Sequence, residues 1–516
     1  MALSEYKRYR LLEMLPGMIV WSVFLAAGML IFFQPLWVLL FVIVYDVFWL
    51  VRAFYIVVFV LIAFSRFRKA EQVDWRGKLA ETPAIAAKVQ ATKHLVVIPT
   101  YEDPLELLQT TFRALTKVDY PIKGNMVVVL AGEEREGEAF TKKAEALQKE
   151  FDSLFLHFLV TVHPKDISGE IAGKGSNTHW AGRKAQEWID VHGFSYDNII
   201  VSSFDSDTVT HQQYFSYLTY IYCTIDNPTR RSYQPIPLFT NNVWDAHALM
   251  RIVSAGTTFW LLGETLRPER MLTFSSHSMS FRALVDVGFW QNDIVTEDSR
   301  IALQGIIRYD GDYAVTPLYI PITMDAVHAQ SFLQSAKNQY KQIRRWAYGV
   351  ENFPFMVWHF VGNKRISFVK KFRYVFNLLE GVVSWATAPI LILALGRLPF
   401  FFATEAEKET AIYQNTPFIL GVLVNVALIT LLVTAVFNIL LLPPRPESRS
   451  SARYGIMILQ WLLFPISIIL FGSIPAIDAQ TRLMFGKYLG FFPTPKIRRR
   501  LPNEPAPGEP GITIQK

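Results

Sequence analysis

Two aspartates, Asp205 and Asp207, follow a short apolar run and are separated by one residue. Carboxylates at positions i and i+2 beyond the end of a strand can point the same way. Such a pair suits a hard divalent cation that bridges a diphosphate. Ligands of open α/β sheets bind at the carboxyl ends of strands, which is where this pair is expected. An acidic turn is the alternative interpretation of the same three residues.

A second acidic group, Thr296-Glu297-Asp298, precedes an apolar helix expected at about 299–307. One interpretation is a helix start, in which Thr296 caps the helix and the two acids favour its dipole. The other is a general base held at the helix start, able to take a proton from an acceptor hydroxyl.

The segment Gln342-Ile343-Arg344-Arg345-Trp346 combines an amide, guanidinium groups and an indole ring. Gln342, Arg345 and Trp346 share one helix face by their i, i+3, i+4 spacing. That face offers a guanidinium for phosphate and a flat ring for a sugar or base. The alternative is a basic helix at a membrane surface with an interfacial tryptophan.

The elements that must position these groups alternate between strands and helices. Helices are expected at 104–116 and 136–150, between short apolar runs at 94–99, 126–130, 154–162 and 198–204. This alternation predicts an α/β domain with a mostly parallel sheet. The domain is expected to cover residues 93–330.

The rest of the chain is typical of a membrane protein. Of its 516 residues, 51% are apolar and 18% charged, and the net charge of +7 lies largely beside apolar runs. Full spans are expected at 17–33, 36–64, 375–396 and 417–442, and interfacial helices at 334–360 and 365–374. A nucleic-acid partner is not expected, and the single cysteine, Cys223, excludes an intrachain disulfide.

Two membrane features leave alternatives open. Asp46 and Arg52 lie within the second apolar run, so either they face the interior of a helix bundle or the crossing ends near Arg52. The segment 454–476 is interrupted by prolines, and the basic cluster Arg498–Arg500 follows it. Because basic residues favour the cytoplasm, a re-entrant hairpin is expected at 454–476, followed by a cytoplasmic, Pro-rich, disordered tail from Leu501.

The order strand, D-x-D, T-E-D and Q-x-x-R-W resembles the membrane-embedded family 2 glycosyltransferases, which include cellulose, chitin and hyaluronan synthases. The chain departs from the family's Q-[QR]-x-R-W motif only at Ile343. Residues 97–102, with Thr100 and Glu102, look like the loop that holds the nucleotide base, and Glu133 stands where the family has an acidic pair. Lys174, in Gly-Lys-Gly-Ser-Asn, resembles a nucleotide-binding lysine, and 491–496 resembles a gating loop with Pro493 in place of Val.

The resemblance implies a GT-A (Rossmann-like) cytoplasmic domain inserted between transmembrane helices, with interfacial helices. The expected division follows the chain: an N-terminal membrane region with two spans, a linker, the glycosyltransferase domain, interfacial helices, a C-terminal membrane region and a cytoplasmic tail. These cover residues 1–69, 70–92, 93–330, 331–374, 375–480 and 481–516.

It also implies inverting, metal-dependent transfer of a sugar from a UDP-sugar to a growing polysaccharide, at an inner or plasma membrane. Asp298 would be the catalytic base, positioned by Glu297 and Thr296, with Mg²⁺ or Mn²⁺ held by Asp207 and Asp205. The residues that bind the nucleotide-sugar would comprise Thr100, Glu102, Glu133, Lys174, Asp205, Gln342, Arg345 and Trp346, with Gln342 and Trp346 at the acceptor end. Non-processive transfer to a lipid carrier or glycolipid is the alternative. A transporter or sensor with a degenerate transferase domain is the alternative from another class.

Overall fold

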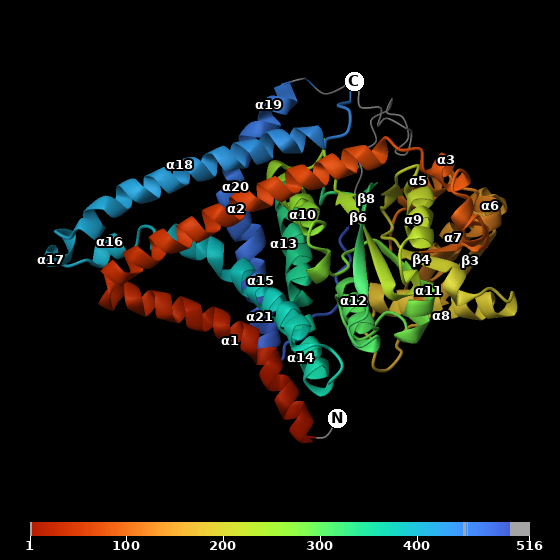
Figure 1. The fold of residues 1–516 in the computed structure, drawn as a ribbon, viewed down its shortest axis with the longest axis horizontal. Coiled ribbons are helices and arrows are strands. Elements are labelled where there is room, and N and C mark those ends of the chain that lie inside the picture. The colour runs from red at the N-terminus through yellow and green to blue at the C-terminus, as the bar shows by residue number, and fades with distance from the viewer. Residues whose placement is uncertain (1–2, 447–449, 451, 496–516) are drawn as a thin grey trace.

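The computed structural model describes residues 3–446, 450 and 452–495. The predictions made for the basic cluster Arg498–Arg500, for Lys496 of the gating loop and for the tail from Leu501 lie outside the described residues. The described residues form a mixed α/β sheet domain joined to several long apolar helices (Figure 1).

The sheet has eight strands in the order β3-β2-β1-β4-β7-β6-β8-β5. Strands β3, β2, β1 and β4 are parallel, whereas β7 is antiparallel to both of its neighbours and β5 is antiparallel to β8. Strand β6 is parallel to β8, so the expectation of a mostly parallel sheet holds for β3-β2-β1-β4 and for β6-β8, and fails at β7 and β5. The strands are β1 (Lys93–Pro99), β2 (Met126–Glu133), β3 (His157–His163), β4 (Ile199–Ser203), β5 (Val209–Thr210), β6 (Arg231–Leu238), β7 (His277–Ser280) and β8 (Ala314–Thr323).

Helices cover both faces of the sheet because side chains alternate along each strand. Val96 and Ile98 of β1 pack into a core with α5 (Leu105–Thr116), α7 (Glu138–Phe151) and α9 (Tyr214–Thr224). Leu95 and Val97 pack on the opposite face, in a core with α8 (Lys174–Val191), α11 (Phe281–Asp286) and α12 (Glu297–Arg308). The strands are thus buried on both sides, and the free edge for ligands is at their carboxyl ends.

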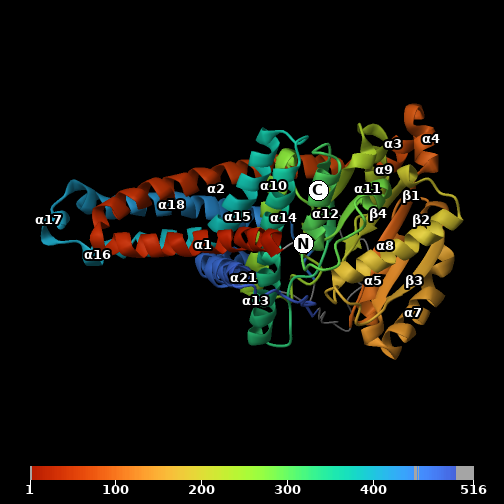
Figure 2. The ribbon, with the colours of Figure 1, turned by 90° about the horizontal axis from the view of Figure 1, so that it is seen from below.

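Five helices are long and apolar enough to cross a membrane. Four of them extend away from the sheet towards the short helices α16 (Pro399–Phe402) and α17 (Glu405–Lys408) (Figures 1 and 2). These four are α1 (Leu3–Phe33), α2 (Pro35–Glu71), α15 (Phe368–Leu395) and α18 (Ala411–Leu440). The interfacial helix expected at 365–374 is instead mostly the first part of α15, because no breaker residue separates it from the span.

The fifth apolar segment does not form the expected re-entrant hairpin. Residues 452–484 are one helical run, α19 (Ala452–Leu459) to α20 (Phe464–Ile468) and α21 (Ile474–Met484), with 3₁₀ and π turns between them. Pro465 and Pro475 lie near helix starts, where a missing N–H is tolerated, so they do not turn the chain back. In Figure 1 this run passes across the direction of the other four helices, beside the sheet domain.

The two ends of the described chain meet at α21. The Arg10 guanidinium donates to the carbonyl oxygens of Leu483 and Met484 at 3.1 and 2.9 Å, and the Trp21 indole N–H donates to Thr481 at 3.0 Å. Cations near the C-terminal carbonyls of a helix are favourable, so this contact caps α21.

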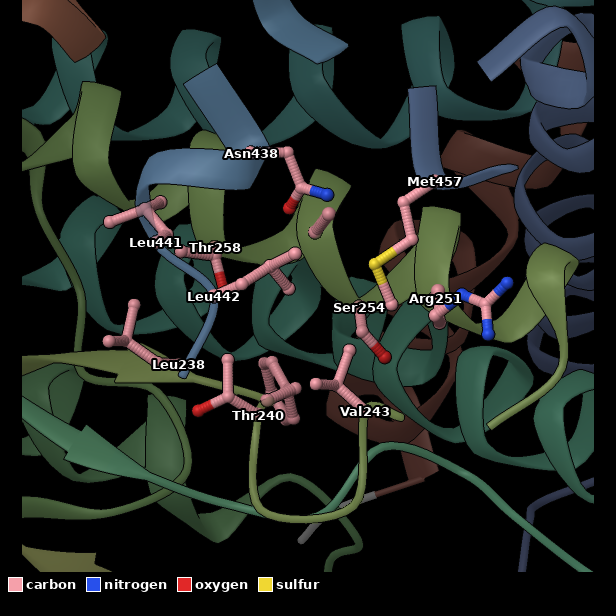
Figure 3. A pocket seen from close by; sticks show the side chains of 12 residues that line it. Leu238, Thr240, Val243, Arg251, Ser254, Thr258, Asn438, Leu441, Leu442 and Met457 are labelled. Carbon is pink, nitrogen blue, oxygen red and sulfur yellow. The ribbon is translucent and has the colours of Figure 1, made fainter. Parts of the chain in front are cut away.

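Helix α10 (Ala248–Glu264), which was not among the elements expected from the sequence, joins the sheet to the apolar helices. Its residues Ile252, Phe259 and Leu262 share one core with the ends of α2, β6 and α18. Figure 3 shows a small pocket at this junction, into which Asn438 of α18 points from above Thr258 and Ser254 of α10. The lining residues of this pocket are distinct from all of the candidate site residues.

Candidate active site

The candidate residues gather at the carboxyl end of the parallel strands. Thr100 follows β1, Glu133 ends β2, and Asp205 and Asp207 follow β4. The first residue of α8 is Lys174, and α12 begins with Glu297 and Asp298. The short segments after buried strands and before helix N-termini therefore bring together groups that are far apart in the sequence.

Lys174 lies between two of the predicted carboxylates. Its ammonium Nζ is 2.6 Å from Asp205 Oδ1 and 3.6 Å from Glu297 Oε1. Burial alone would lower the pKa of Lys174, but the charges of Asp205, Glu297 and Asp298 outweigh it and hold that pKa above its ordinary value. The lysine is therefore a fixed positive charge at the N-terminus of α8, where backbone N–H groups also favour anions.

Glu297 is deeply buried, with 2% of the residue exposed. Burial raises its pKa to about 7, against the opposing charges of Lys174 and Arg345. Within the described residues its Oε2 has no hydrogen-bond partner. A Cβ at Gly175 would lie 2.9 Å from the Gln291 carbonyl oxygen and 3.4 Å from the Glu297 Cβ, so a glycine lets α8 approach this acid.

The Asp298 carboxylate is held by the backbone through both oxygens. Ser275 N–H donates to Oδ2 at 2.8 Å, and Ser299 N–H donates to Oδ1 at 2.8 Å. These two bonds fix the carboxylate at the start of α12, on the side of Ser275 and Asp205.

Thr296 does not cap α12 with its side chain. Its hydroxyl instead donates to Glu351 Oε1 at 2.6 Å, and the Arg300 guanidinium donates to the Glu351 carbonyl at 3.0 Å. Burial raises the pKa of Glu351, which the Arg300 charge and the Thr296 hydroxyl oppose. The capping interpretation of Thr296 is thus wrong, and its partner Glu351 was not predicted because the two are 55 residues apart.

On the side of β1 and β2, the cation Arg135, which no sequence motif indicated, contacts the predicted Glu133 and the ring of Tyr101. Arg135 Nε donates to Glu133 at 2.6 Å, and its guanidinium lies 4.3 Å from the centre of the Tyr101 ring. Burial raises the pKa of Glu133, and Arg135 opposes that shift.

The loop after β1 is bent sharply next to these groups. Thr100 N–H donates to the Ala131 carbonyl at 2.8 Å, and the Thr100 hydroxyl donates to Asp103 at 3.0 Å. Glu102 has φ +57, in the left-handed region. The Tyr101 ring, the Arg135 guanidinium and the Glu133 carboxylate thus form one contiguous surface at the ends of β1 and β2, called the shelf below.

The Q-x-x-R-W residues lie on α13 (Phe332–Ala347), but they do not all face the acids. The charge of Arg345 acts on Glu297, whereas Trp346 packs edge-on against Phe274 at 5.4 Å between ring centres. The Gln342 side chain accepts from Gln339 within the same helix at 3.1 Å. Of the three, Arg345 is the residue whose charge acts on the carboxylate cluster.

The segment that resembles a gating loop reaches the site. The Arg345 guanidinium lies 4.9 Å from the centre of the Phe491 ring, and the Lys341 ammonium lies 4.4 Å from the centre of the Phe492 ring. Phe491 also packs with the core that includes Ala347 and Tyr348. Residues 489–495 therefore close one side of the site, next to the lysine loop.

The donor set fits a divalent cation through two carboxylates. Asp207 is 2% exposed, and its Oδ2 accepts from Asp325 N–H at 3.0 Å. Residues 3–446, 450 and 452–495 contain no group of three or more acids, histidines or cysteines arranged for a metal. Mg²⁺ commonly binds one or two carboxylates and takes its remaining ligands from substrate phosphates and water. Asp205 and Asp207 offer two such carboxylates at this edge, and in this structure the Asp205 oxygens accept from Lys174 and Ser275.

Comparisons with known proteins give structural matches at low identity. No family model and no curated protein matches the chain. Residues 1–349 of S. aureus TarS in complex with UDP-GlcNAc align at 12% identity over 77% of this chain and 93% of that chain, with a TM-score of 0.35. The same fragment in complex with UDP aligns at 11% identity over the same shares, with a TM-score of 0.34. At these TM-scores the likeness identifies neither fold nor function, and both are derived from the chain's own residues.

Proposed function

We propose that this chain is a glycosyltransferase that moves a sugar from a UDP-sugar to a growing polysaccharide, with inversion. The observation that carries the proposal is the position of Lys174, 2.6 Å from Asp205 and 3.6 Å from Glu297. A cation, the D-x-D pair and the T-E-D acids are thereby brought to one edge of the sheet. Binding of a diphosphate beside a base for a hydroxyl needs this combination.

Some of the site residues act on the leaving diphosphate, and others act on the acceptor. Lys174 and Arg345 offset the charge that develops on the diphosphate, while the shelf of Glu133, Arg135 and Tyr101 holds the nucleotide end. Asp207 and Asp205 would hold Mg²⁺ or Mn²⁺, which would add positive charge beside the departing diphosphate.

Asp298 acts as the general base. It accepts the proton of the acceptor hydroxyl, whose oxygen forms the new bond to the anomeric carbon as the bond from that carbon to the diphosphate oxygen breaks. The products are a sugar-extended acceptor and UDP. General-base assistance of this kind typically contributes about 10²–10⁴-fold.

The acceptor end is assigned to Trp346, which borders Phe274 and Phe239. Aromatic faces stack on sugar rings, which favours a glycan acceptor. The limited set of apolar helices keeps transfer to a lipid carrier or glycolipid as the second candidate. If the chain were instead a transporter or sensor with a degenerate transferase domain, it would not turn over any UDP-sugar.

We place the apolar helices in an inner or plasma membrane with the sheet domain in the cytoplasm. Arg66, Arg68 and Lys69 at the sheet end of α2 support this orientation, because basic residues favour the cytoplasmic side.

The decisive experiment compares Asp298→Asn with the wild type in lipid, using UDP-glucose, UDP-galactose, UDP-GlcNAc and UDP-glucuronate with Mg²⁺ or Mn²⁺. If Asp298 is the base, UDP binding is retained while transfer falls by at least ~10²-fold. The thermal midpoint falls modestly in either case, because Asn has one acceptor oxygen for the N–H groups of Ser275 and Ser299. If the acid serves only the helix dipole, the variant loses about 0.3–1 kcal/mol of stability and keeps its transfer. Transfer within a few-fold of wild type would remove Asp298 from the mechanism.

A further inference from the structure

One residue contacts carboxylates from two distant parts of the site. The Ser275 hydroxyl donates to Asp205 Oδ2 at 2.6 Å, and the Ser275 N–H donates to Asp298 Oδ2 at 2.8 Å. Asp205 follows β4 and Asp298 begins α12, so no local segment of the chain fixes the distance between them. Ser275 provides that link through two adjacent groups of a single residue.

The backbone of Ser275 is held in an unusual conformation. Its φ is +52, in the left-handed region that non-glycine residues rarely adopt. Such a conformation persists only where the surroundings enforce it, and it is concentrated at functional sites. A serine is therefore kept here at a conformational cost that a glycine would avoid.

The surroundings that enforce the conformation are visible on both sides of the residue. The buried Gln234 of β6 accepts from Phe274 N–H at 2.8 Å and donates to the Ser276 carbonyl at 3.3 Å. His277 Nδ1 donates to the Ser275 carbonyl at 3.0 Å. Hydrogen bonds thus fix the backbone at Phe274, Ser275 and Ser276. They hold the Ser275 hydroxyl and N–H in position to donate to the two acids.

We propose that Ser275 is a positioning residue that holds the metal-side carboxylate Asp205 and the base Asp298 in register. The proposal rests on the proposed function, because it uses the roles assigned there to both acids. Lys174 alone cannot perform this task, since its contact is with the other oxygen of Asp205, Oδ1, and its flexible stem sets no fixed distance. The hydroxyl is the part that a glycine lacks, whereas the N–H to Asp298 remains in every variant except proline.

The test uses two substitutions with opposite expected effects. Ser275→Gly removes the hydroxyl and relieves the left-handed strain, so the thermal midpoint is unchanged or higher while transfer falls at least 10-fold. Ser275→Thr keeps a hydroxyl but places a β-branched residue at positive φ, so the thermal midpoint falls while transfer exceeds that of Ser275→Gly. The matched control is Asn227→Gly, at an exposed position with φ +50, remote from the site.

Three measurements are made on each preparation: thermal midpoint, UDP binding with and without Mg²⁺, and transfer from the UDP-sugars named above. Ser275→Gly is expected to keep metal-free UDP binding, to lose part of the Mg²⁺-dependent gain, and to change kcat more than donor KM. A purely structural role would lower the midpoint of Ser275→Gly and leave the Mg²⁺ dependence unaltered, which would overturn the proposal. If the wild type transfers sugar and Ser275→Gly is equally active, the role of Ser275 is overturned while the proposed function stands. Absence of turnover by the wild type would overturn the proposed function and this assignment with it.

Discussion

Gly173 lies directly against Phe491. A Cβ at Gly173 would be 2.5 Å from both Cβ and Cγ of Phe491, closer than side-chain atoms can approach. The loop that carries Lys174 and the loop at 489–495 therefore fit together only while residue 173 has no side chain.

Gly173→Ala is expected to displace the 489–495 loop and to reduce transfer by about 10-fold or more, since misplacements near 1 Å can cost on the order of 10²-fold. In a Phe491→Gly background the same alanine should cost much less, because the colliding atoms are gone. A double-mutant cycle on transfer rate measures this coupling. Gly124→Ala, with nothing within 4 Å of its Cβ, is the control. Equal costs in both backgrounds would show that the contact has no influence on turnover.

Asp207→Asn tests the metal assignment. The amide oxygen can still accept from Asp325 N–H, so the fold should survive, but the negative charge needed by a divalent cation is lost. Transfer and Mg²⁺-dependent UDP binding are expected to fall by at least ~10²-fold. Mutation of residues that only hydrogen-bond a metal ligand already lowers metal affinity or activity by about 10–100-fold. Isothermal titration with UDP at several Mg²⁺ concentrations gives the readout, and Asp226→Asn at an exposed turn is the matched control. Metal-stimulated activity in Asp207→Asn would contradict the assignment.

The helix arrangement predicts which loops face the catalytic side. Single cysteines at Ser450, Phe485 and Lys142 should react with an impermeant maleimide only after permeabilisation. A cysteine at Glu409, beside α17, should react in intact cells. The native Cys223 is buried, so background labelling is low. Labelling of Phe485→Cys but not Lys142→Cys in intact cells would mean that residues 452–484 cross the membrane.

His94 predicts a pH dependence of stability. Its ring is fully buried in β1, contacts Thr219 at 2.8 Å, and burial lowers its pKa to about 3 from an ordinary 6.5. The unfolded chain therefore binds more protons below pH 6.5, and this contribution to stability, present above 6.5, is lost as the pH falls towards 3. The thermal midpoint should decline from pH 6.5 to 4.5, and more gently in His94→Gln. The exposed His192 serves as the control, because His192→Gln should leave the slope unchanged.

The sequence was sufficient for the parallel half of the sheet and for the four helices that extend from it. The run Leu95–Ile98 of β1 is continuous and apolar because this strand is buried on both faces, which is a strong local signal. The predicted bounds of α5 and α7 agree with the structure to within about two residues, because both carry a one-sided apolar pattern.

The rest depends on contacts that no local pattern encodes. Strand β6 contains Pro235 and Pro237 and pairs with β7 and β8 from later in the chain, so its place is decided by tertiary packing. Helix α10 is apolar on several sides because it is shared between the sheet and the apolar helices. The partners Thr296 with Glu351 and Ser275 with Asp298 are likewise set only when distant segments meet.

The capping of α21 by Arg10 joins positions 10 and 484, which are 474 residues apart. A ribosome must therefore synthesise nearly all of the described chain before α1 finds its partner. The sheet can form much earlier, because its strands end at Thr323. Contacts of such high sequence separation form late, since the long intervening segment must be ordered first. Phe491 follows α21 by only a few residues, so a nascent chain carries the acids well before it carries the ring that packs against Gly173 and Arg345.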